Sequence, residues 1–162
     1  LNQSLPIVLK EPKNLSARQN MLIGAMLAGQ AFANAPVAAV HALAYPLGGH
    51  CHLSHGHSNA LVLTEVLRFN ASHAKQQYAE LMQSLNPQAQ GTPEQLCQQF
   101  IEHMQKICDE SGLVLKLKDL NIDEKMLETF AKDAMLQTRL LINNPKEMNE
   151  QEAFNIYKAV YA

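Results

Sequence analysis

The stretch GQAFANAPVAAVHALAYPLGGHCHLSHGHSNA, residues 29–60, decides the fold of this chain. Its first residues finish a run over 16–32 in which small and apolar side chains recur every three or four positions, with Ser16 placed to cap the start. This pattern predicts a buried helix. Pro36 can open a second helix, and Pro46 with the two nearby glycines is expected to end it. The histidine-rich residues that follow are then a loop between two helices.

The segment after this loop is apolar on nearly every side. Residues 59–69 contain five large aliphatic side chains, interrupted mainly by Thr64, Glu65 and Arg68. This composition predicts a helix at the centre of the fold. A buried strand remains an alternative for the same residues, because a short apolar run does not separate the two.

Toward the C-terminus the pattern is helical throughout. Periodicity and capping residues predict further helices over 72–85, 92–112, 123–134 and 149–160. Thr92 before a proline and an acidic residue is a helix start, and Asn149 with Glu152 resembles a capping box. No alternating strand pattern joined by hairpin turns occurs. The predicted fold class is therefore all-α, with six or seven helices.

Length and composition exclude several classes of protein. With 162 residues the chain has the size of one domain, and we expect a single helical domain over residues 1–162. Hydrophobic residues make up 47% and charged residues 17%, which argues against intrinsic disorder. A formal charge of −2 without a basic cluster predicts no nucleic-acid partner. The phosphate-binding patterns GxGxxG and GxxxxGK[ST] are absent, so we expect no nucleotide cradle.

The sequence also bears on the cellular compartment. No apolar stretch reaches the roughly 18 residues that a membrane-spanning helix requires, so we expect no membrane partner. The N-terminal residues lack the pattern of a signal peptide. Cys51, Cys97 and Cys108 are an odd number without CxxC spacing, which fits a reducing compartment. These features predict a cytoplasmic protein.

Histidine is concentrated in one segment, because five of the seven histidines lie between positions 41 and 57. They are His41, His50, His52, His55 and His57. Neutral imidazole is a common ligand for zinc, iron, nickel and copper, so the cluster is a candidate metal site. A solvated polar loop is the alternative, since the HExxH spacing of zinc enzymes is absent.

The order of residues across this region resembles the iron-containing alcohol dehydrogenases. In that family a small-residue helix ends in Gly-x-x-Phe-x-Asn, followed by His-x-x-x-His-Pro-Leu-Gly and then His-Gly-x-x-Asn-Ala. Residues 29–34, 41–48 and 55–60 follow this order. The segments 120–124 and 143–149 are similar to the family's late helix start and its Asn-Pro-Arg turn. The resemblance covers most of the chain.

The resemblance implies a metal site. The family's two C-terminal metal-binding histidines fall on His41, late in the predicted second helix, and on His55, at the start of the third. The implied ion is Fe²⁺, with Zn²⁺ as a competitor, because histidine and carboxylate ligands suit both. His50, His52 and His57 match no ligand position, and we expect them to be solvated or to line a cavity.

Two further residues fall at positions that the family uses around the nicotinamide. Tyr45 stands where the family often has a histidine, and it is the candidate catalytic residue that relays a proton. Its unperturbed pKa near 10 makes it a poorer base at neutral pH than imidazole. Phe32 falls at a cavity-lining position and is the candidate for cofactor contact. Core packing is the alternative for both aromatic side chains.

The chain thus resembles the C-terminal helical domain of such an enzyme, with the dehydroquinate synthase-like fold. The family's other two metal ligands, an Asp and a His, and its α/β domain that binds NAD(P) are not in this sequence. The implied activity is interconversion of alcohols with aldehydes or ketones, and the implied partners are that small-molecule substrate and the missing N-terminal domain. We expect the isolated chain to be folded but inactive, with self-association into a homo-oligomer left open.

Two alternatives remain. One is a related enzyme of the same fold, such as a glycerol dehydrogenase or a dehydroquinate synthase. The Tyr-Pro-Leu-Gly motif at residues 45–48 favours the alcohol dehydrogenase branch. The other is a non-catalytic helical module that binds metal loosely through its histidines, or not at all.

Overall fold

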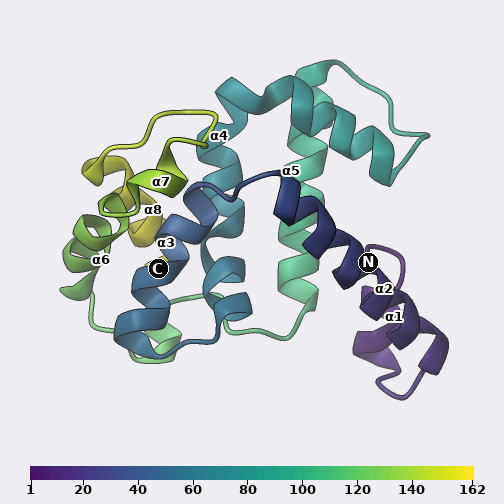
Figure 1. Cartoon of the computed structure of the whole chain (residues 1–162), viewed down its shortest axis with the longest axis horizontal. Coiled ribbons are helices and arrows are strands. Elements are labelled where there is room, and N and C mark those ends of the chain that lie inside the picture. The colour runs from purple at the N-terminus through teal and green to yellow at the C-terminus, as the bar shows by residue number, and fades with distance from the viewer. The chain divides into compact units, whose positions relative to one another are not determined.

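A computed structural model describes residues 1–162 and contains helices but no strand. Eight α-helices and one 3-10 helix follow one another along the chain (Figure 1). The predicted all-α class is confirmed. Two compact units make up the chain, Leu1–Pro36 and Val37–Ala162, and each is described by itself. The single domain expected over residues 1–162 stays a prediction.

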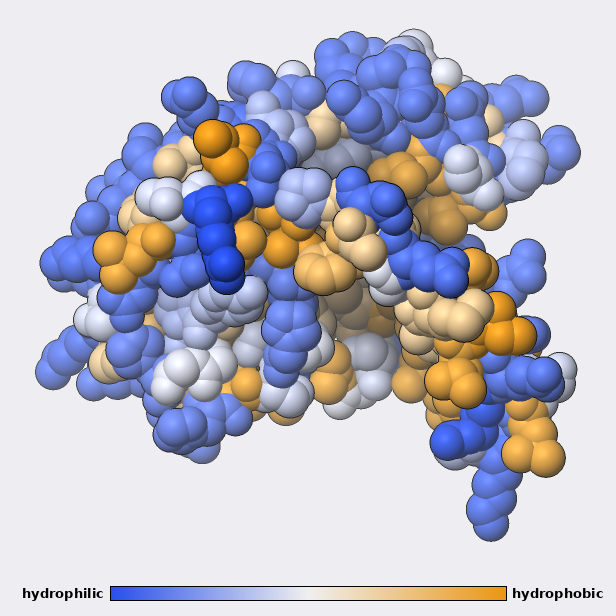
Figure 2. Space-filling model, viewed as in Figure 1, coloured by the Kyte–Doolittle hydropathy of each residue, from blue (hydrophilic) through white to orange (hydrophobic).

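The first unit consists of α1 (Leu5–Lys10) and α2 (Leu15–Asn34). The N-cap of α2 is Asn14 and not Ser16, because the Asn14 side chain accepts a hydrogen bond from the Ala17 N–H at 3.0 Å. The predicted burial of this helix is wrong, since Ala17 is its one buried residue. Figure 2 shows apolar surface, in orange, over this helix. Leu22 exposes 73% of its surface. The small-residue pattern therefore forms a helix, but the apolar side chains of this helix are not buried in a core.

The second unit begins with α3 (Ala39–Cys51), which runs through the predicted stop at Pro46. The expectation that Pro46, Gly48 and Gly49 end this helix is wrong. Proline has a helical φ and removes only one N–H, so burial of the surrounding turns can compensate for that loss. Leu43 and Leu47, on either side of Pro46, are fully buried. The helix ends instead at His52, whose φ of 55° is left-handed.

Helix α4 (His55–Leu85) joins two segments that the sequence analysis separates. The break in helical geometry, with φ −119° and ψ 17°, is at Ala74, inside the second predicted segment, and residues 70–72 between the two segments are helical. The strand alternative for residues 59–69 is wrong. Because α4 begins at His55, the signature His-Gly-x-x-Asn-Ala occupies its first turns.

The remaining elements are α5 (Pro93–Glu110), a 3-10 turn η1 (Lys118–Leu120), α6 (Met126–Met135), α7 (Thr138–Leu141) and α8 (Glu150–Tyr161). The predicted start of α5 is confirmed, with Thr92 and Gln95 forming a capping box. Asn149 and Glu152 form the predicted capping box at α8. Both starts are determined by side chains three residues apart in sequence, which explains why the sequence predicts them.

Two apolar clusters hold the second unit together. The first joins α3 and the beginning of α4 to α6 and α8, around Phe130 and Tyr157. The second joins the later part of α4 to α5, with the Tyr78 and Phe100 rings 5.4 Å apart. The first cluster positions the N-terminal turns of α3 and α4, where the candidate site lies.

Regarding membranes, no helix by itself has the length and apolar character of a span; one bent pair, Leu15–Asn34 with Ala39–Cys51, meets that test on length and composition alone.

Candidate metal centre

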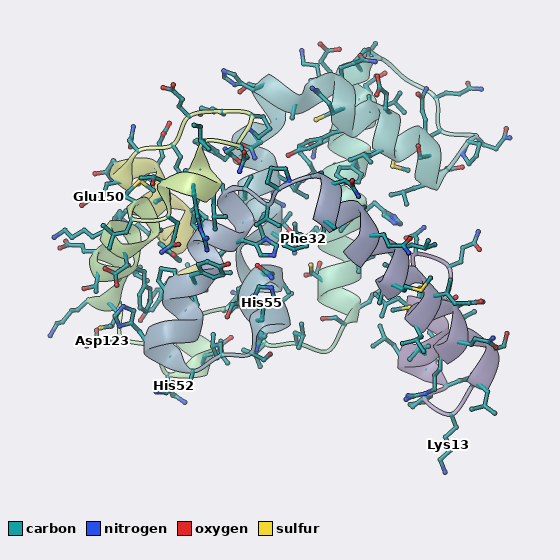
Figure 3. All side chains as sticks on the ribbon, viewed as in Figure 1. Lys13, Phe32, His52, His55, Asp123 and Glu150 are labelled. Carbon is teal, nitrogen blue, oxygen red and sulfur yellow. The ribbon has the colours of Figure 1, made fainter.

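His41 and His55 come together although they lie on different helices. Their ring centroids are 5.1 Å apart and the ring planes are inclined by 52°. His55 is the first residue of α4, as predicted. His41 lies in the first turn of α3 and not late in that helix, because α3 starts at Ala39 and continues past Pro46. Figure 3 shows His55 at the start of α4 and His52 at the far end of α3.

The surroundings of His41 favour its neutral form. Burial, and secondly the neighbouring His55, lower the pKa of His41 below its usual value. A metal ion binds the deprotonated ring nitrogen, so a lowered pKa keeps His41 ready to bind at neutral pH.

Asn59 is a member of the site that the sequence analysis did not assign. It lies one turn after His55 on α4, and its side-chain amide nitrogen, Nδ2, is 3.0 Å from Nε2 of His55. Its amide oxygen, Oδ1, is buried and has no hydrogen-bond partner. The hydroxyl of Ser58, which is 1% exposed, likewise lacks a partner. The signal for Asn59 was its i,i+4 spacing from His55, which places both side chains on one helix face.

These residues fit part of a metal site. Two imidazoles suit Fe²⁺ or Zn²⁺, and the unpaired Asn59 oxygen is a buried acceptor that a further group could satisfy. No group of three or more His, Cys, Asp or Glu side chains in this chain could hold a metal ion. The chain therefore offers two ligands, and additional ligands would have to come from outside it.

The other proposed site residues are placed less specifically. Tyr45 lies one turn after His41 on α3, is 39% exposed, and lines a surface hollow with Pro46 and residues of α6 and the turn after it. Phe32 lies near the end of α2 in the first unit and is 57% exposed. Their predicted roles in proton relay and cofactor contact stay predictions.

Two of the remaining histidines of the cluster form hydrogen bonds to distant parts of the chain. His50 Nε2 is 2.6 Å from a carboxylate oxygen of Asp133, which links α3 to α6. His57 on α4 is hydrogen-bonded through Nε2 to the carbonyl of Val114, at 2.6 Å. His52 is the C-cap of α3. The predicted loop is shorter than expected, because His50 lies in α3 and His57 in α4. His50 is exposed and lines the hollow beside Tyr45, which agrees with the expectation of a solvated or cavity-lining residue, whereas the distant partners of His50 and His57 were not predicted.

Comparison with known sequences agrees with this placement. The sequence model described as Fe-containing alcohol dehydrogenase family, C-terminal, matches residues 1–161. Long-chain-alcohol dehydrogenase 1 of Geobacillus thermodenitrificans is 34% identical, over 100% of this chain and 41% of that protein. Alcohol dehydrogenase 4 of Saccharomyces cerevisiae is 31% identical, over 99% of this chain and 41% of that protein.

Solved structures give the same result. A crystal structure of 1,3-propanediol oxidoreductase matches 99% of this chain and 44% of its own, with a TM-score of 0.86 and 27% identity. The alcohol dehydrogenase of Oenococcus oeni matches 99% of this chain and 42% of its own, with a TM-score of 0.90 and 26% identity. This chain thus spans well under half the length of these relatives. It belongs to the iron-containing alcohol dehydrogenase family, in which it corresponds to the C-terminal helical domain.

Proposed function

We propose that this chain is the metal-holding part of an iron-dependent, NAD(P)-linked alcohol dehydrogenase, in which His41 and His55 supply two of the metal ligands. The observation that carries the proposal is the 5.1 Å approach of their rings from separate helices. Support also comes from the names of the relatives, which are dehydrogenases of alcohols.

A divalent ion held by His41 and His55, Fe²⁺ in preference to Zn²⁺, would supply Lewis acidity toward an alcohol or carbonyl oxygen, and a bound nicotinamide would supply the hydride chemistry. The residues of this chain hold the proposed ligands in the charge state and position that this chemistry needs. Burial keeps His41 neutral by lowering its pKa, and the core beneath α3 and α4 keeps the two imidazoles close. Tyr45, one turn from His41, has an exposed position from which its hydroxyl can pass a proton.

The rest of the enzyme is part of the proposal. This chain covers 41% of its relatives, so we assign the other metal ligands and the dinucleotide site to an N-terminal portion like theirs. The 162-residue chain alone is expected to fold and to show no NAD(P)H-coupled alcohol oxidation. If the isolated chain oxidised alcohols with NAD(P) and lost this activity in His41→Ala, the assignment of the other ligands and the dinucleotide site to an N-terminal portion would be contradicted.

The test is the metal content of the protein that includes the N-terminal portion. We expect His41→Ala and His55→Ala each to abolish stoichiometric metal, because removing a ligand leaves the ion under-coordinated. Turnover should fall with the metal. His73→Ala is the matched control, since His73 is an exposed histidine on α4. Elemental analysis that finds one ion per chain in both ligand variants would overturn the site.

A further inference from the structure

The contact between Asn59 and His55 restricts where the His55 ring carries its proton. The amide nitrogen of Asn59 is a donor with no acceptor capacity, and it faces Nε2 of His55 at 3.0 Å. A hydrogen bond between the two requires a lone pair on Nε2. The neutral ring then carries its hydrogen on Nδ1.

The start of α4 holds the two side chains close to each other. His55 and Asn59 are one turn apart there, and the next turn packs Leu61 and Val62 in the core. Asn59 is partly buried and its amide oxygen is buried without a partner, so the amide nitrogen is the group that faces the exposed His55 ring. A donor at hydrogen-bond distance from one ring nitrogen favours the tautomer that leaves a lone pair on that nitrogen.

We infer that Asn59 is a positioning residue that selects Nε2 of His55 as the ligating nitrogen and occupies its lone pair until a metal ion arrives. This inference rests on the proposed function, because it concerns the same pair of histidines. Asn59 itself does not ligate the ion. It keeps the proton on Nδ1, so that no change of tautomer is needed for binding, and its amide leaves Nε2 when the ion binds.

The first experiment determines the tautomer of His55 in the metal-free 162-residue chain. Two-bond ¹⁵N–¹H correlation spectra of the imidazoles, recorded well above the usual histidine pKa of about 6.5, distinguish a proton on Nδ1 from one on Nε2. We expect His55 to be in the Nδ1–H form. In Asn59→Asp the carboxylate can only accept, so the proton should move to Nε2.

Asn155→Ala is the control for the tautomer measurement. Asn155 is an exposed helical asparagine in an i,i+4 contact with Gln151 at 3.1 Å, so its removal deletes the same group from a surface without histidine. It should leave His55 in the Nδ1–H form. A wild-type His55 with its proton on Nε2, or an Asn59→Asp variant with an unchanged tautomer, would overturn the inference.

The second experiment measures competition with metal in the protein that includes the N-terminal portion, using Zn²⁺ alone as the probe and the ring signals of His41 and His55 as the readout. Because the amide must leave Nε2, Asn59→Ala should bind Zn²⁺ about 2- to 10-fold more tightly than wild type, the equivalent of one net hydrogen bond. Equal or weaker binding would refute the competing role of Asn59. Zn²⁺ that perturbs neither ring in any variant would instead overturn the proposed function, and the tautomer result would stand independently.

Discussion

Tyr157 is the largest of the completely buried side chains, and it joins α8 to α3. Its hydroxyl donates a hydrogen bond to the carbonyl of Leu43 at 2.6 Å, and its ring lies against Phe130 with centroids 5.6 Å apart. Since Leu43 lies on the helix that carries His41, this one contact connects the core to the candidate site.

Tyr157→Phe should destabilise the chain by about 1 to 2 kcal/mol, because the buried carbonyl of Leu43 loses its donor while the ring is retained. Urea denaturation followed by circular dichroism measures the change. Tyr161→Phe, one turn later on the same helix, is the control and should have a smaller effect. Equal effects in the two variants would remove the special role of the Tyr157 hydroxyl.

The same residue predicts a pH dependence. Burial, and secondly Asp133, raise the pKa of Tyr157 well above its usual value near 10. The folded chain then holds a proton that the unfolded chain releases, so this stabilisation is complete below pH of about 10 and is lost as pH rises further. Burial raises the pKa values of Tyr78 and the three cysteines as well. Tyr157→Phe should therefore reduce the alkaline loss of stability without abolishing it.

The proposed proton relay by Tyr45 can be tested by removing its hydroxyl. In the protein with its N-terminal portion, Tyr45→Phe should lower turnover by about 10- to 100-fold if the hydroxyl relays a proton. Metal content should not change, because Tyr45 is not among the proposed ligands. The kcat and its pH profile are the measurement. Unchanged turnover with an unchanged profile would leave Tyr45 a packing residue.

Among the elements, the turn between α7 and α8 is attached to α4 by a pair of side-chain amides. Asn70, 4% exposed on α4, and Asn144 in the turn donate to each other at 2.9 and 2.8 Å. The Asn144 amide also donates to the carbonyl of Lys146 at 2.6 Å. The segment that resembles the family's Asn-Pro-Arg turn thus has a structural function in this chain.

Asn70→Ala and Asn144→Ala should each destabilise the chain by about 1 to 3 kcal/mol, because each leaves the other amide, buried in Asn70 and half-buried in Asn144, without its partner. The double variant should be little less stable than either single one, since both lose the same contact. A double-mutant cycle in urea checks this. Losses that add to within about 0.5 kcal/mol would show that the two amides act independently.

The helix boundaries show which sequence signals, capping residues or proline, correctly predict where a helix begins or ends. The capping boxes at Thr92 and Asn149 were predictable, because their partners lie three residues away. The stop at Pro46 was not, because the burial of Leu43 and Leu47 outweighs the preference of a single residue. The break at Ala74 was not predictable either, because no proline or glycine lies beside it.

At the scale of the whole molecule, the two units differ in how they are stabilised. Both apolar clusters consist of residues between 37 and 162. The first unit has two buried residues, Ser4 and Ala17, and exposes Leu22, Met26 and Leu27 along α2. An exposed apolar surface of this kind promotes self-association.

Deletion of residues 1–36 should therefore leave a helical, cooperatively unfolding domain whose stability changes by less than about 1 kcal/mol. It should also reduce binding of the dye ANS, which reports exposed apolar surface. Leu22→Gln with Met26→Gln in the 162-residue chain is the control and should lower ANS binding without shortening the chain. Loss of cooperative unfolding in the deleted form would show that the second unit needs the first.

The helical class, the helix starts at Thr92 and Asn149 and the family could be predicted from the sequence alone, because these depend on periodicity, caps and residue order over short stretches. The sequence also identified His41 and His55 as candidates through the resemblance. Three features became known only from the three-dimensional structure: the 5.1 Å distance between the rings of His41 and His55, the contact of Asn59 with His55, and the pairing of His50 with Asp133. Distances between side chains on separate helices depend on how the core of α3, α4, α6 and α8 packs, and no local pattern encodes that packing.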